Sequence, residues 1–139
     1  MVDSKRPARF TVLLPTEREG WHETLVQLLE PQGVQAVLAH SGREALDLIE
    51  STAIHAAVLD TAMPGLGGLH VIKLMREMRN RVPPPAILLT QRLTNSLLRE
   101  ALGMHVFSVL SKPVDFNLLL DALARLLRRY HEDRWPKES

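Results

Sequence analysis

Five short apolar segments, separated by helical patterns, constrain the fold of this chain more than any other feature. They span residues 10–14, 34–38, 54–59, 86–89 and 106–110. Several of them are apolar without alternation, which is typical of strands covered on both faces. Between and after them, apolar residues recur at helical spacing. The pattern predicts an α/β fold: a doubly wound, five-stranded parallel sheet of flavodoxin-like type, in the order 2-1-3-4-5, with helices on both faces.

Helix starts are marked by residues that can cap them. Ser41 and Glu44 have the spacing of a capping box, and Asp115 precedes the long leucine-rich helix at the end of the domain. Either Thr94 or Asn95 can cap the helix before it. These signals support the alternation of strands and helices.

Composition excludes several classes of function. The chain of 139 residues has no cysteine, so it has no disulfide framework, thiol nucleophile or cysteine-based zinc site. Its formal charge of +1 gives no general attraction to nucleic acid or anionic membranes. No apolar run reaches the length that spans a bilayer, and no nucleotide-binding glycine loop follows a strand. Because the chain has no cysteine and no apolar run that spans a bilayer, we expect a cytoplasmic protein.

The ends of the chain differ in composition from its centre. Residues 1–9 are basic and are expected to form a flexible leader, and residues 10–131 the single domain. Residues 132–139 are polar and are interpreted as a tail or the start of a linker. No DNA-reading motif is present, so contact with nucleic acid would require an output domain outside these residues.

Three chemically active side chains stand at the ends of consecutive predicted strands. Asp60, Thr90 and Lys112 are distant in sequence, but the carboxyl ends of parallel strands meet at one edge of the sheet. A carboxylate there can accept a phosphoryl group, a lysine can neutralise its charge, and a hydroxyl can donate to its oxygens. Each residue alone is more often a cap, a turn residue or a solvated charge; the combination favours a site.

At these residues the chain resembles the receiver domain of two-component response regulators. The resemblance covers about residues 9–130 and is carried by the segments 58–68 (VLDTAMPGLGG), 87–90 (ILLT) and 110–113 (LSKP). It implies that Asp60 is the phosphoacceptor, Thr90 the switch hydroxyl and Lys112 the phosphate-pairing lysine. It also implies a histidine kinase or phosphotransfer protein as partner, a cis Lys112–Pro113 bond, and no enzyme activity beyond accepting phosphate on aspartate.

The sequence departs from the family where a metal ion is usually bound. The family ends its first strand with two acidic residues that hold Mg²⁺, and this chain has Pro15 and Thr16 there. Asp60 and Glu17 are then the candidate metal ligands, Glu17 only if its loop is rearranged. Because Mg²⁺ prefers several carboxylate ligands, we expect Mg²⁺ binding to be weak or absent.

Two further positions differ from the family. Gln91 follows Thr90 where a small residue is usual, and it either crowds the site or faces solvent. Val109 stands where the family has its switch aromatic. Phe107 is expected to share the face of Val109, because alternate strand residues point the same way.

Two functional readings stay open, and a third is disfavoured. The chain is either a phosphorylated receiver or a pseudo-receiver that acts by protein contact alone; an unrelated flavodoxin-like enzyme lacks a second catalytic set. The family's signalling face corresponds to residues 96–103, 106–110 and 115–130. We expect a homodimer or partner contact through this face, the one formed by the fourth helix, fifth strand and fifth helix, with Leu120, Leu127 and neighbouring arginines exposed on it.

Overall fold

The computed structural model describes residues 9–16, 20–79 and 81–131. The predicted leader, apart from Arg9, and the predicted tail lie outside the described residues. The proposed domain limits therefore stay predictions.

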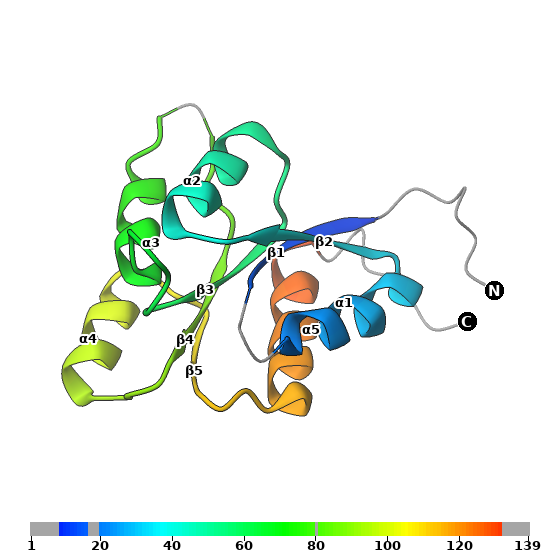
Figure 1. Ribbon diagram of the computed structural model, residues 1–139. Helices are drawn as coiled ribbons and strands as arrows, with labels where there is room; N and C mark the ends of the chain where they lie inside the picture. Colours follow the sequence, from blue (N-terminus) through cyan, green and yellow to red (C-terminus); the bar gives the residue numbers. More distant parts are fainter. Residues whose placement is uncertain (1–8, 17–19, 80, 132–139) are drawn as a thin grey trace.

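Five parallel strands form one sheet in the predicted order β2-β1-β3-β4-β5 (Figure 1). Their bounds are β1 (Phe10–Pro15), β2 (Val34–Ala39), β3 (Ala56–Asp60), β4 (Ala86–Thr90) and β5 (Ser108–Ser111). The central strands β3 and β4 are buried along their whole length, so residues that point to either face must be apolar. This explains the unbroken apolar runs in the sequence.

Helices cover both faces of the sheet (Figure 1). α1 (Trp21–Leu29) and α5 (Phe116–Tyr130) lie on one face, and α2 (Gly42–Ser51), α3 (Gly68–Arg76) and α4 (Asn95–Gly103) lie on the other. A short 3-10 helix, η1 (Glu30–Gln32), follows α1. Successive strand residues contribute to opposite cores: Val58 packs into the core under α1 and α5, and Leu59 into the core under α2 and α3. The predicted fold class is confirmed.

Side-chain caps start three of the helices where the sequence predicts them. The Ser41 hydroxyl accepts a hydrogen bond from the Glu44 N–H at 3.1 Å. Thr94, rather than Asn95, caps α4 by accepting from Leu97, and Asp115 caps α5 by accepting from Leu118. Local chemistry therefore sets these helix starts.

β5 is shorter than predicted, and this changes the direction of Phe107. The strand begins at Ser108, and the Phe107 ring contacts Tyr130 and the guanidinium of Arg125 on α5. Val109 packs into the core on the other face. The expectation that Phe107 and Val109 share a face is wrong, because alternation holds only within the strand.

α5 buries more of its leucine side chains than predicted. Leu127 is 1% exposed and belongs to the core, and Leu120 is partly buried against the same core. The expected contact surface of Leu120 and Leu127 is therefore wrong, because α5 lies flat on the sheet and buries two adjacent rows of side chains. Tyr130, the last residue of α5, is 49% exposed. Among the helices of the described residues, none is long and apolar enough to cross a membrane.

Candidate functional site

The fold brings Asp60, Thr90 and Lys112 together at the carboxyl edge of the sheet. β3 ends at Asp60 and β4 at Thr90, and Lys112 follows β5 directly. Strand register places Asp60 opposite Leu89, and the Lys112 N–H donates to the Thr90 carbonyl at 2.8 Å. Parallel pairing alone therefore assembles three residues that span more than fifty positions of sequence.

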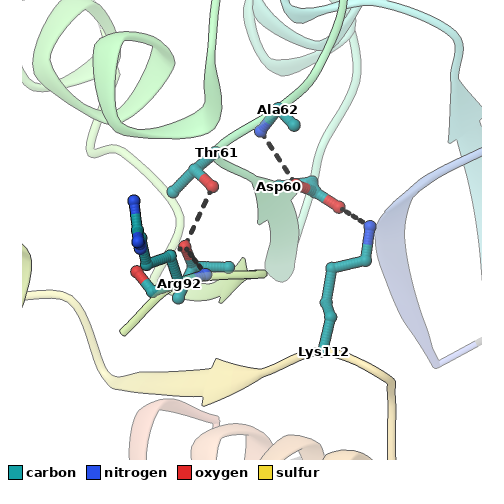
Figure 2. A network of polar contacts seen from close by, with 6 residues as sticks. Asp60, Thr61, Ala62, Arg92 and Lys112 are labelled. Atoms are coloured by element: carbon teal, nitrogen blue, oxygen red, sulfur yellow. Dashed lines mark hydrogen bonds and ion pairs between the residues drawn. The ribbon is translucent and has the colours of Figure 1, made fainter. Parts of the chain in front are cut away.

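A short ion pair joins Asp60 and Lys112. Lys112 Nζ lies 2.6 Å from Asp60 Oδ2, and the other carboxylate oxygen, Oδ1, accepts a hydrogen bond from the Ala62 N–H at 2.8 Å (Figure 2). Asp60 is 3% exposed. Charge-assisted hydrogen bonds of this length hold a carboxylate in one orientation. The peptide bond from Lys112 to Pro113 is cis, as the resemblance implies.

Gly68 packs directly against the backbone of Asp60. A Cβ atom at Gly68 would lie 2.7 Å from the Asp60 carbonyl oxygen and 3.0 Å from its nitrogen. Only a residue without a side chain lets the first turn of α3 approach the end of β3 so closely. The glycine eight residues after the aspartate is therefore part of the support for the site.

The Thr90 hydroxyl is engaged by two residues that the sequence analysis did not identify. Thr61 Oγ1 donates to Thr90 Oγ1 at 3.1 Å, and Thr90 Oγ1 also bonds the backbone N–H and carbonyl of Arg92, both at 3.3 Å (Figure 2). Parallel pairing of β3 with β4 could have revealed Thr61, because it puts the residue after Asp60 beside the end of β4. Arg92 carries no comparable signal in the sequence.

The described residues at this edge of the sheet supply few of the oxygen ligands that Mg²⁺ prefers. β1 ends at buried Pro15, Thr16 offers one neutral oxygen, and the Asp60 carboxylate already binds the Lys112 ammonium. Within residues 9–16, 20–79 and 81–131, no three His, Cys, Asp or Glu side chains are grouped to hold a metal. Mg²⁺ prefers several carboxylates and waters in octahedral geometry. Glu17, the other candidate ligand, lies outside the described residues.

Gln91 and Val109, the two other residues that depart from the family pattern, differ in how deeply they are buried. Gln91 is exposed, in agreement with the solvent-facing alternative, so its side chain does not fill the buried side of the site. Val109 is half-buried in the core under α2, α3 and α4. An aliphatic side chain there has no ring to rotate in response to Thr90.

Comparison with known proteins agrees with this geometry. The family model described as "Response regulator receiver domain" matches residues 13–124. The response regulator MprA of Mycolicibacterium vanbaalenii is 35% identical over 128 residues, which cover 92% of this chain and 54% of that protein. The transcriptional regulatory protein CpxR of Escherichia coli K12 is 32% identical over 130 residues, covering 92% of this chain and 52% of that protein. This chain spans about half the length of these two relatives.

A solved structure also matches. The receiver domain of the Francisella response regulator 1452 superposes with a TM-score of 0.76 at 25% identity, covering 86% of this chain and 97% of that chain. The likeness therefore extends over most of the chain rather than over a local motif.

Proposed function

Because the chain belongs to the receiver domains of two-component response regulators, we propose that Asp60 is its phosphoacceptor. Lys112 is then the cation that pairs with the phosphoryl group, and Thr90 is the switch hydroxyl. The observation that carries the proposal is the 2.6 Å contact between Lys112 and Asp60 at the carboxyl edge, with Thr90 at the end of the strand between them.

The reaction is a phosphoryl transfer to a carboxylate. An Asp60 oxygen attacks the phosphorus of a phosphohistidine; the P–N bond breaks, and its electron pair stays on the imidazole, which then takes up a proton. The contacts of the Asp60 carboxylate with the Lys112 ammonium and the Ala62 N–H orient the group that forms the new P–O bond. Lys112 stabilises the charge on the phosphoryl oxygens once they arrive.

Labelling with a phosphoryl donor tests this assignment. The protein is incubated with acetyl phosphate or a phosphorylated histidine kinase, and intact mass reports a gain of one phosphoryl group that hydroxylamine removes. We expect label on Asp60 in the wild type and none in Asp60→Asn, which keeps the size of the side chain. If neither the wild type nor a Pro15→Asp/Thr16→Asp variant takes label, the protein acts as a pseudo-receiver through contact alone.

We propose in addition that Mg²⁺ binds weakly, supported by the small donor set among the described residues. Trp21 is the first residue of α1, the element that follows β1 in the chain, so its fluorescence is a suitable reporter. The titration uses a Trp135→Phe background, which leaves Trp21 as the only indole. We expect little change in millimolar Mg²⁺ and a saturating change after Pro15→Asp/Thr16→Asp. A saturating change without those substitutions contradicts the proposal.

Partners follow from the family. Receiver domains of two-component systems act with kinases or phosphotransfer proteins, and we propose such a protein as the donor here.

We also propose self-association through α4, β5 and α5, supported by the half-exposed side chains of Leu102 on α4 and Leu118 and Tyr130 on α5. Sedimentation of Leu102→Glu/Leu118→Glu against the wild type tests this, and a monomeric wild type contradicts it. Any output module would lie outside this chain.

A further inference from the structure

Thr61 is tied to β4 through both its backbone and its side chain. Its N–H donates to the Leu89 carbonyl at 2.9 Å, which extends the pairing of β3 with β4 by one step beyond Asp60. Its hydroxyl then lies 3.1 Å from the Thr90 hydroxyl (Figure 2). The backbone bond fixes where the Thr61 side chain begins, so the contact between the hydroxyls follows from strand register.

The Thr90 hydroxyl has no unused bonding capacity in this arrangement. A threonine hydroxyl has one donor and two acceptor sites. Here it accepts from Thr61 and from the Arg92 N–H, and it donates to the Arg92 carbonyl. The two bonds to Arg92 are 3.3 Å long, and the bond from Thr61 is the shortest of the three.

We propose that Thr61 is a positioning residue that holds the Thr90 hydroxyl in a resting orientation, and that this contact must open before Thr90 can donate to a phosphoryl oxygen on Asp60. Donation to a phosphoryl group requires Thr90 to give up the Arg92 carbonyl and to turn, which takes its oxygen away from Thr61. The contact therefore opposes the switch. The signalling role rests on the proposed function, whereas the resting contact does not.

Threonine methyl NMR on the unphosphorylated protein tests the contact directly. Three-bond couplings of a selectively labelled Thr90 methyl group report the χ1 rotamer. We expect one rotamer in the wild type and in Thr61→Ser, which keeps the hydroxyl. In Thr61→Val, which keeps the shape, the minor rotamers should grow by about threefold to tenfold, the range expected for loss of one neutral hydrogen bond.

Internal controls make the result decisive. Thr94 caps α4 through its own hydroxyl and should keep its couplings in every variant. Thr61→Ala repeats the test if the valine variant does not fold. A Thr90 coupling that stays at the wild-type value in Thr61→Val, or one that is averaged in Thr61→Ser as well, overturns the proposal.

A second measurement tests the signalling role. At limiting acetyl phosphate, Thr61→Val should raise the level of phosphorylated Asp60 by a similar factor, and Thr61→Ser should match the wild type. Equal levels in all three proteins overturn this role. If none of the three proteins takes label, the phosphoacceptor assignment and the signalling role of Thr61 are both overturned. The Thr90 methyl couplings still test the resting contact between Thr61 and Thr90 in that case.

Discussion

Replacing Gly68 by alanine should destabilise the domain and move Asp60, although alanine is the better helix former. Gly68 is the first residue of α3 and is buried against the end of β3. A Cβ atom there would meet the carbonyl oxygen, carbonyl carbon and nitrogen of Asp60 at 2.7, 2.9 and 3.0 Å. All three are backbone atoms, so either α3 or the end of β3 must shift by several tenths of an ångström.

Two opposing terms set the size of the effect. Overpacking of this kind costs about 1–3 kcal/mol, and the helix propensity of alanine returns up to about 1 kcal/mol. The free energy of unfolding should therefore fall by about 1–2 kcal/mol. Gly103→Ala is the matched control, because it lies at the end of α4 with no atom within 4 Å of the added Cβ. It should raise the free energy of unfolding by about 0.4–1 kcal/mol.

Urea denaturation followed by circular dichroism measures both variants against the wild type. The amide chemical shift of Ala62, whose N–H donates to Asp60, reports whether the carboxylate has moved. The reasoning fails if Gly68→Ala is as stable as the wild type, or if Gly68→Ala and Gly103→Ala change stability in the same direction.

Three other substitutions or titrations test the packing and the caps. Leu127→Glu should lower the free energy of unfolding by about 3 kcal/mol or more, because the side chain is 1% exposed, whereas Leu28→Glu on α1, at 45% exposure, should change it little; equal effects in urea denaturation would contradict the burial. Asp115→Ala removes the cap of α5 and should lower the free energy of unfolding by about 1 kcal/mol in the same assay. An unchanged free energy of unfolding would contradict the role of the cap. The pKa of Glu44 lies below its ordinary value of 4.5 because the His40 side chain and backbone N–H bond its carboxylate. The ionised Glu44 carboxylate contributes fully to stability at a pH above its ordinary pKa, and this contribution is lost as the pH falls through the folded-state pKa. A carboxyl NMR titration should show that the pKa of Glu44 rises in His40→Ala.

The sequence alone was sufficient for the class of fold, its strand order and the meeting of Asp60, Thr90 and Lys112 at one edge of the sheet. Strands buried on both faces must be apolar throughout, so the runs that became β3 and β4 were visible without a structure. Polar residues at the ends of such strands could then be expected at one edge of the sheet. The caps at Ser41 and Asp115 were equally readable, because they act on N–H groups only three residues away.

Only the tertiary structure decided what each of these residues contacts. Leu127 is core and Tyr130 half-exposed because burial depends on how flat α5 lies on the sheet, and helical spacing alone does not give this. Phe107 turned away from Val109 because β5 begins later than the apolar run. The hydroxyl contact of Thr61 with Thr90 depends on the register of β3 against β4 across twenty-nine residues of sequence, a long-range pairing that no local pattern encodes.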